Sequence, residues 1–215
     1  MSLRAGIERQ GNWLIVRFPE THTVVSWAPV GGGETETNTI AWYRVTAEDL
    51  RPPVDPKEFL KNRLAKAQIS KAVGLLTSAD IDSYADIEKS LDGITVRSVV
   101  TVGLTNALRV GDLPRLAEPV GTINLLCQIS RPLSKEAFLE ALSIAAEART
   151  TALLESGIVS TESQMAATGT GTDCIVIAAP RAGETLRYAG KHTLLGHLIG
   201  SSVLDALRSG IKIKN

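Results

Sequence analysis

One short stretch, residues 167–179, constrains the fold of this chain more than any other. Its second half, from Cys174 onward, is apolar and rich in β-branched residues, which is typical of a buried strand. Its first half carries three threonines separated by glycines and ends at Asp173. Glycine lets backbone approach a ligand closely, and polar side chains beside a buried strand require hydrogen-bonding partners. A fold that buries this strand must therefore place a polar, glycine-lined segment at its entry.

The composition argues against a nucleic-acid partner. The 215 residues fit one domain and include 44% hydrophobic and 21% charged residues. Lysine plus arginine and aspartate plus glutamate each number 23, so the net charge is zero, and aromatic residues make up only 4%. Nucleic-acid binders usually carry a basic excess and aromatic side chains that stack on bases.

The cellular compartment can be predicted from the length of the apolar segments and from the surroundings of the two cysteines. No apolar run reaches membrane-spanning length, and the first ten residues lack the apolar core of a signal peptide. Cys127 and Cys174 each lie in an apolar strand-like run, where cysteine behaves as a small hydrophobic residue. We therefore expect a cytoplasmic protein with no membrane partner and with both thiols reduced.

Strand patterns outnumber helix patterns and often follow one another directly, which argues against a doubly wound parallel sheet. We expect a single α+β domain, with a mostly antiparallel or mixed sheet and about four helices packed on it. The helices are expected at residues 56–69, 79–92, 135–156 and 192–209. The strands are expected at residues 4–9, 13–18, 21–27, 39–45, 72–77, 94–104, 121–129 and 174–179.

The helix expected at residues 135–156 contains a charge in an apolar stripe. At 100° per residue, Arg149 shares a face with Phe138, Leu142, Ala145 and Leu153. An unpaired buried guanidinium would cost several kcal/mol, so Arg149 must extend to solvent or find a partner.

Asp173 is the acid that we expect to pair with Arg149. Such a pair would be either purely structural or part of a site, and the periodicity leaves both readings open. Glu147 points the other way, and its spacing alone predicts a solvated face.

Two further segments are candidates for a binding site. Residues 31–33 are three consecutive glycines, which suit either a flexible loop or a loop that closes against a ligand. They do not form a dinucleotide-binding fingerprint, because no helix pattern follows them. The long β-branched stretch 94–104 ends at Thr105 and Asn106, a small polar cluster that marks either a turn or a site.

The residue types limit the chemistry. The three histidines and two cysteines lack metal-site spacing, and neither a Gly-x-Ser-x-Gly elbow nor a phosphate-binding Gly-Lys-Ser/Thr loop occurs. We therefore expect no metal held by the protein. Hydroxyls, amides, carboxylates and one histidine suit hydrolysis of a carbonyl compound, in which a base activates water or a threonine hydroxyl and backbone N–H groups hold the oxyanion. The same set suits a non-catalytic pocket, so both readings stay open.

Seven short segments occur in a characteristic order along the chain: Ala28-Pro29-Val30-Gly31-Gly32-Gly33, Val73-Gly74-Leu75-Leu76-Thr77, Thr101-Val102-Gly103-Leu104-Thr105-Asn106-Ala107, Gly121-Thr122-Ile123-Asn124, Glu147-Ala148-Arg149-Thr150, Thr168-Gly169-Thr170-Gly171-Thr172-Asp173, and Tyr188-Ala189-Gly190 with Thr193-Leu194-Leu195-Gly196. Together they resemble the adenosylcobinamide amidohydrolases of corrinoid salvage. The resemblance covers about residues 24–205 and leaves the N-terminal strand hairpin, residues 1–23, outside it. Two departures stand out. The family commonly has lysine at the position of Arg149 and serine at that of Thr105. Because arginine is a poor proton donor or acceptor, a general-base role does not fit position 149.

The resemblance implies hydrolysis of an amide: the aminopropanol arm of adenosylcobinamide would be cut from the corrin ring, leaving adenosylcobyric acid. The cobalt corrinoid would then be a small-molecule substrate, and no cofactor would be held by the protein. A catalytically silent corrinoid-binding protein and an amidase for another small-molecule amide are the alternatives. Assembly into a homo-oligomer is left open.

Site roles follow from combining the resemblance with the residue chemistry. Asp173 or Glu147 would act as general base on water, and His192 would protonate the leaving amine. A threonine nucleophile is the main rival, and its candidates are Thr168, Thr170 and Thr172. Arg149 would orient the acid, while Asn106, Asn124 and the amides of residues 169–172 would stabilise the oxyanion. The expected substrate-binding residues are Gly31, Gly32, Gly33, Thr105, Asn106, Asn124, Arg149, Gly169 and Gly171.

Overall fold

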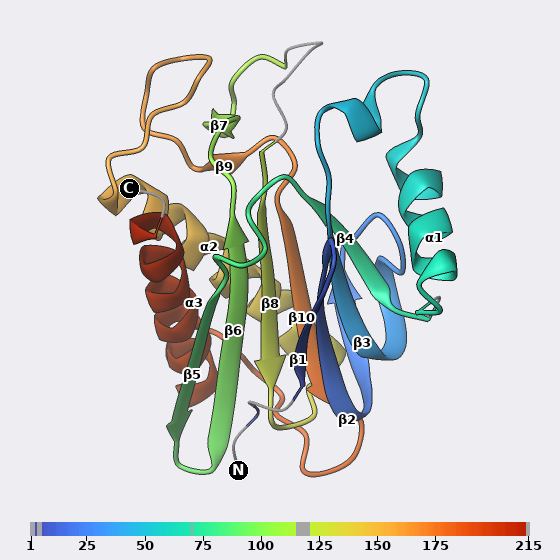
Figure 1. The fold of residues 1–215 in the computed structure, drawn as a ribbon. Helices are drawn as coiled ribbons and strands as arrows, with labels where there is room; N and C mark the ends of the chain where they lie inside the picture. The colour runs from blue at the N-terminus through green and yellow to red at the C-terminus, as the bar shows by residue number, and fades with distance from the viewer. Residues whose placement is uncertain (1–2, 4–5, 70, 115–120, 214–215) are drawn as a thin grey trace.

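The computed structural model describes residues 3, 6–69, 71–114 and 121–213. They form a mixed eight-stranded sheet with three α-helices and one 3-10 helix, together with a separate two-stranded ribbon (Figure 1). The helices are η1 (Glu48–Leu50), α1 (Pro56–Lys66), α2 (Lys135–Glu155) and α3 (Leu194–Lys212). The strands are β1 (Ile7–Gln10), β2 (Trp13–Ser26), β3 (Gly33–Arg44), β4 (Val73–Thr77), β5 (Ala85–Leu91), β6 (Ile94–Val102), β7 (Ala107–Leu108), β8 (Ile123–Ile129), β9 (Gly169–Thr170) and β10 (Cys174–Pro180).

The strand order confirms the expected α+β domain with a mixed sheet. The order is β4-β3-β2-β10-β8-β6-β5, with β1 also paired to β2, and β7 pairs with β9 in the separate ribbon. Only the pairs β10–β8 and β3–β4 are parallel; the other pairs are antiparallel. Within the described residues there are three α-helices, one fewer than expected.

The helix expected at residues 79–92 is wrong, because residues 85–91 form the edge strand β5 instead. β5 pairs antiparallel with β6 through the two-residue connection Asp92-Gly93, whose φ angles are 45° and 75°. Two consecutive positive φ angles define the turn that matches the twist of a tight hairpin, and Asp-Gly is a favoured sequence for it. The hairpin pairing of β5 with β6, which adds β5 to the edge of the sheet, therefore overrides the weak helical pattern.

The sheet is buried on both faces, and its central strands alternate between two cores. On β10, Ile175 and Ile177 face the core under α2 and α3, whereas Cys174 and Val176 face a second core. That second core joins side chains from strands far apart in the sheet, such as Trp42 of β3 and β8's Leu126. The sheet must therefore curl strongly, so that β4 comes close to β8.

The helices cover the outside of this curved sheet. Figure 1 shows α2 and α3 together on one side and α1 beside β4 at the other edge. α2 begins at Ser134, whose hydroxyl accepts a hydrogen bond from the N–H of Ala137.

Gly196 and Gly200 of α3 are in different surroundings. A methyl group added at Gly196 would overlap the carbonyl oxygen of Gly190 and lie 2.5 Å from that of Ala189, both backbone atoms. One added at Gly200 would lie 3.8 Å from Cγ2 of Ile144, an ordinary contact.

We therefore expect Gly196→Ala to lower the free energy of unfolding by about 2 kcal/mol, because the backbone has to shift. Gly200→Ala should raise it by about 0.5–1 kcal/mol, because alanine is the better helix former. Urea denaturation of the two variants beside the wild type measures both values. Equal stabilities for the two variants would contradict this account of α3.

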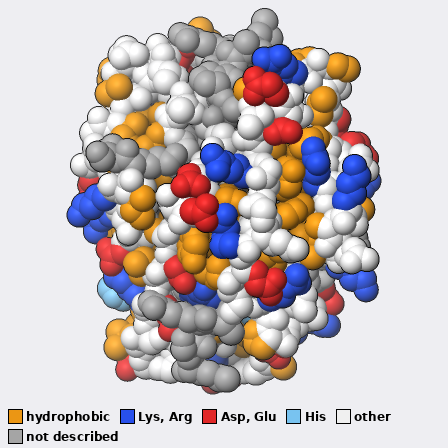
Figure 2. Space-filling view, in the orientation of Figure 1, with side chains coloured by type: hydrophobic (Ala, Val, Ile, Leu, Met, Phe, Trp, Pro, Cys, Tyr) orange, Lys and Arg blue, Asp and Glu red, His pale blue; other side chains and the backbone are white. Residues whose placement is uncertain are grey.

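The outer surface carries no large area of one charge sign on the face drawn in Figure 2, where basic and acidic side chains are interspersed with hydrophobic ones. Among the described residues, no helix is long and apolar enough to cross a membrane.

Candidate active site

The threonine–glycine run lies at one end of the sheet, where three structural elements meet (Figure 1). Gly169 and Thr170 form β9 and pair with β7, and the chain then turns through Gly171 and Thr172 into β10. α2 contacts β9 from the side of the first core. The run thus stands at the entry of a buried strand, as the sequence pattern indicates.

The Asp173 carboxylate accepts four hydrogen bonds or ion-pair contacts. Its Oδ1 accepts from the N–H of Ile123 at 3.0 Å and from the hydroxyl of Thr170. Its Oδ2 accepts from the N–H of Thr170 at 3.0 Å and pairs with Nη1 of Arg149 at 2.9 Å. A carboxylate offers about four acceptor positions, so none is left for a water molecule unless a present partner moves away.

Arg149 reaches Asp173 from α2, and this confirms the pairing expected from the helix periodicity. The side chains of the two residues are only 17% and 6% exposed. Gly169 makes the approach feasible, because a Cβ atom there would lie 2.5 Å from Oδ2 of Asp173. Nε of Arg149 is buried and has no partner among the residues that the structure describes.

Burial raises the pKa of Asp173 above its usual range, although the Arg149 charge and the hydrogen bonds from Thr170 and Ile123 oppose that shift. Burial also raises the pKa of the neighbouring Cys174 thiol to about 12, and the charge of Asp173 adds to the effect. The thiol is therefore protonated at neutral pH and is a poor nucleophile.

The three threonines of the run differ in the partners of their hydroxyl groups. The Thr168 hydroxyl accepts from the N–H of Val110 at 2.8 Å, and the Thr172 hydroxyl donates to the carbonyl oxygen of Gly121 at 2.9 Å. Only the Thr170 hydroxyl donates to a carboxylate, that of Asp173. Thr170 is therefore the one candidate of the three that is paired with a potential base.

Asn106 lies beside the same turn. Its side chain is buried, and Oδ1 has no partner in the described part of the chain. A Cβ atom built at Gly171 would lie 3.6 Å from the Asn106 Nδ2 atom. The Asn106 carboxamide thus lies next to the glycine that follows Thr170, and both Asn106 and Thr105 border Gly121 on the neighbouring loop.

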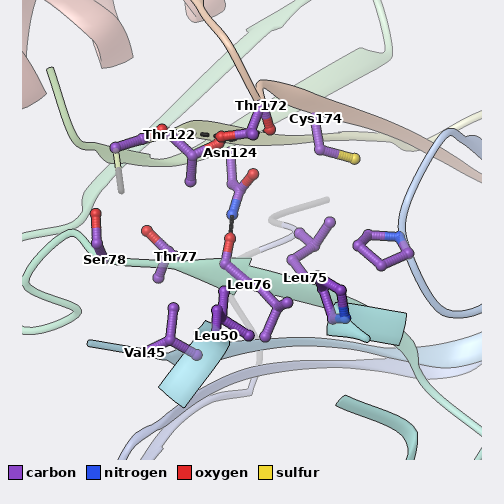
Figure 3. A pocket seen from close by; sticks show the side chains of 13 residues that line it. Val45, Leu50, Leu75, Leu76, Thr77, Ser78, Thr122, Asn124, Thr172 and Cys174 are labelled. Atoms are coloured by element: carbon purple, nitrogen blue, oxygen red, sulfur yellow. Dashed lines mark hydrogen bonds between the residues drawn. The ribbon is translucent and has the colours of Figure 1, made fainter. Parts of the chain in front are cut away.

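Asn124 faces away from Asp173, into a cavity on the other face of the sheet. Its neighbour in the sequence, Ile123, belongs to the core under α2, and side chains along a strand alternate between faces. The cavity has a volume of about 180 Å³ and lies between the β4 end and the beginnings of β8 and β10 (Figure 3). Asn124 Nδ2 donates to the carbonyl oxygen of Leu76 at 2.7 Å and so ties β8 to β4.

Comparison with known proteins decides what kind of protein has this site. A family model described as adenosylcobinamide amidohydrolase matches residues 2–215. The chain belongs to the adenosylcobinamide amidohydrolase family.

Relatives agree with this assignment. Adenosylcobinamide amidohydrolases of Halobacterium salinarum and Methanosarcina mazei are 28% and 26% identical over 86% and 75% of this chain, and over 79% and 78% of theirs. An uncharacterized protein of Methanocaldococcus jannaschii is 32% identical over 97% of this chain and 91% of its own. A β-aminopeptidase of Burkholderia aligns with a TM-score of 0.47 and 12% identity over 95% of this chain and 80% of that one, a likeness too distant to inform on activity.

Two residues singled out for the amidohydrolase chemistry lie elsewhere. Glu147 is on α2 but two residues from Arg149, which places the two side chains on nearly opposite sides of the helix. Its carboxylate is half exposed and pairs with Lys191, in the loop before α3. His192 is exposed in that same loop. Neither residue has a contact with Asp173 among the described interactions.

The three glycines at residues 31–33 are not among the residues that line the cavity, and Gly31 lies against Val73 at the start of β4. Val30 bridges to Gly74 of β4, and the preceding Pro29 lines the cavity. Gly31 and Gly33 have φ angles of 71° and 87°, which favour glycine. The loop therefore packs against β4, next to the cavity that Pro29 lines.

Two residues at the site carry little signal in the sequence. Trp27 donates its ring N–H to the carbonyl oxygen of Asp173 at 2.6 Å while half of the residue stays exposed. Thr122 donates to the carbonyl oxygen of Thr172 at 2.7 Å and holds the starts of β8 and β10 together. In the sequence, Trp27 is marked only by its position just before the glycine loop. Thr122 is marked only by the Gly-Thr pair that precedes β8.

Metal-binding residue types do not gather in the described part of the chain. No group of three or more His, Cys, Asp or Glu side chains there could hold a metal ion. That the protein holds no metal or cofactor of its own stays a prediction.

Proposed function

We propose that this protein hydrolyses the aminopropanol amide of adenosylcobinamide and releases adenosylcobyric acid, as a step of corrinoid salvage. The observation that carries the proposal is the match of the adenosylcobinamide amidohydrolase model to residues 2–215. The substrate would be a corrinoid whose aminopropanol arm is uncharged. Its cobalt would be part of the substrate and would not be held by the protein.

The Thr170–Asp173 pair is the chemical centre of the proposed mechanism. The Thr170 hydroxyl attacks the amide carbon and passes its proton to Asp173, which is desolvated and therefore a stronger base than an exposed aspartate. The carbon–nitrogen bond then breaks, and the amine leaves with that proton. Water hydrolyses the resulting ester, which releases the acid and restores the hydroxyl group.

Two groups beside this pair support the developing charges. Arg149 holds Asp173 in place and balances its negative charge whenever the carboxylate is ionised, which is before it accepts the proton and again after the proton has passed to the amine. The N–H groups of Gly171 and Thr172, in the exposed turn, and the buried Asn106 amide beside that turn would donate to the oxyanion. Direct attack by water with Asp173 as base is the competing route, and it requires one of the four partners of Asp173 to move away.

The pH dependence of the reaction should report Asp173. The base must be ionised to accept a proton, so activity is present above its pKa and is lost as the pH falls through that pKa. Because burial raises the pKa, we expect the acid limb of the kcat/KM profile to lie above the ordinary aspartate value of 3.8. Rates measured across the acidic range, with stability checked at each pH, test this. An acid limb at or below 3.8 would contradict the assignment.

Incubation of the purified protein with adenosylcobinamide tests the function itself. Chromatography should show loss of substrate with equal amounts of adenosylcobyric acid and 1-aminopropan-2-ol. Tight binding of the corrinoid without release of the amine would instead identify a binding protein. Turnover of other small amides with no turnover of adenosylcobinamide would identify a different amidase.

A further inference from the structure

The cavity between β4, β8 and β10 has the size and chemistry of a binding pocket for a small neutral group. Its volume of about 180 Å³ is close to that of engineered cavities that hold one benzene ring. A corrin macrocycle cannot enter it, whereas a short arm can. Its lining residues are Pro29, Val45, Leu50, Pro56, Leu75, Leu76, Thr77, Ser78, Gly121, Thr122, Asn124, Thr172 and Cys174.

None of these lining residues carries a charge; six are aliphatic residues or prolines, and five carry a hydroxyl or amide group. Transferring an ion into such a cavity without a counter-charge is strongly unfavourable. The cavity therefore selects a neutral ligand with a small aliphatic part.

Asn124 adds a specific hydrogen-bonding requirement. The residue is 1% exposed, and its Nδ2 is occupied by the carbonyl oxygen of Leu76. Its Oδ1 has no hydrogen-bonding partner in the described part of the chain, and Figure 3 shows this oxygen pointing away from Leu76. An acceptor on a cavity-lining residue that accepts no hydrogen bond from the described residues favours a ligand that brings a donor such as a hydroxyl group.

Thr101 lies beside Asn124, although it is not among the residues that line the cavity. It is the register partner of Asn124 on β6, so the two side chains share one face of the sheet. Its hydroxyl is completely buried and also has no partner among the described residues. Two neighbouring buried polar groups on this face thus have unused hydrogen-bonding capacity.

The cavity adjoins the proposed reaction centre through the chain itself. Thr172 and Cys174 line the cavity, and Asp173 lies between them in the sequence. Thr122, another lining residue, bonds to the backbone of Thr172. The cavity therefore lies across the backbone of residues 172–174 from the Asp173 carboxylate, and a group bound in it would contact, through Thr172, the turn that follows Thr170.

We propose that this cavity is the specificity pocket for the hydroxyalkyl arm of the amide substrate, an inference that rests on the proposed function. The uncleaved arm is neutral and has a methyl group and a hydroxyl donor, which match the aliphatic lining and the Asn124 acceptor. Cleavage turns it into a primary amine, which is protonated at neutral pH. The uncharged pocket binds that cation poorly, so cleavage itself drives the amine out.

Titration of the full-length protein with three small probes tests the pocket without any turnover. We expect N-(2-hydroxypropyl)acetamide to shift the backbone amide NMR signals of Leu76, Thr77 and Thr122. N-propylacetamide, which lacks the hydroxyl group, should bind about tenfold more weakly, and 1-aminopropan-2-ol should cause no such shifts. Equal binding of the cation, or shifts that lie elsewhere on the protein, would overturn the proposal. Equal binding of propane-1,2-diol would show that the pocket recognises any small alcohol and not the amide arm, and this too would overturn it.

A pair of variants extends the test to turnover. Leu50 lines the pocket from η1 and is half-buried, so Leu50→Trp should fill the cavity with little effect on folding. Val54, in the same connection, is 40% exposed and does not line the pocket, so Val54→Trp is the matched control. We expect KM for adenosylcobinamide to rise at least tenfold in Leu50→Trp and to stay unchanged in Val54→Trp.

The two proposals fail in distinguishable ways. If wild-type protein binds the hydroxylated probe at the pocket but does not hydrolyse adenosylcobinamide, the pocket stands as a binding site and the proposed function fails. If wild-type protein hydrolyses the substrate, but the probe does not bind and Leu50→Trp has a normal KM, the pocket proposal is refuted and the function stands.

Discussion

Thr170→Ala is expected to lower kcat for amide hydrolysis by at least about a thousandfold, because the variant has no hydroxyl group to attack the amide carbon. Thr170→Ser restores a hydroxyl at the same position and should stay within about tenfold of the wild type. The fold should survive, since the change removes one methyl group and one hydrogen bond from a partly exposed residue. Steady-state rates with adenosylcobinamide, together with thermal denaturation of each variant, measure both effects.

The two neighbouring threonines supply matched controls for this prediction. Their hydroxyl groups bond only to backbone, through Val110 in one case and Gly121 in the other. Thr168→Ala and Thr172→Ala should therefore keep kcat within about tenfold of the wild type. Near-normal turnover in all three alanine variants would exclude the threonine route and leave direct attack by water.

Asp173→Asn is expected to lower the free energy of unfolding by about 3 kcal/mol. It leaves the Arg149 guanidinium, only 17% exposed, without its counter-charge, and removing one partner of a buried ion pair is strongly destabilising. The amide also presents donors towards the N–H and O–H groups that now point at the carboxylate. For a chain of this length the melting temperature should fall by about 6–12 °C, and turnover should be lost as well.

An exposed ion pair separates this effect from a general response to charge removal. Glu155 and Arg208 are in contact at 2.7 Å, and both side chains are nearly half exposed. Glu155→Gln should change stability by less than about 1 kcal/mol, because solvent screens such pairs. Equal stability losses in the two variants would mean that the Asp173–Arg149 pair contributes no more than a surface contact.

The local sequence predicted the parts of the site that depend on nearby residues. The charge at Arg149 within an apolar helix stripe had to extend to solvent or find a partner, and Asp173, just before the buried strand that begins at Cys174, was the partner expected. Both conclusions rest on short-range periodicity and on the cost of an unpaired buried charge, so they did not require knowledge of the fold.

Other features depended on contacts that short-range patterns do not contain. The hairpin between β5 and β6 replaced an expected helix, because strand pairing with the neighbouring sheet outweighs a weak local preference. The spacing of the threonines does not distinguish Thr170 from Thr168 and Thr172. The turn into β10 distinguishes it, because this turn brings the Thr170 hydroxyl to the Asp173 carboxylate.

The sequence by itself determined the class of fold and the family, and it named Asp173 as the expected partner of Arg149, since these follow from local periodicity, burial and motif order. The tertiary structure alone decided that Glu147 and His192 lie by α3, and that Asn124 opens into a cavity closed by Leu76, 48 residues away along the chain. Such contacts arise when the sheet curls and brings β4 against β8. That closure is a property of how all the strands pack together and not of any one segment.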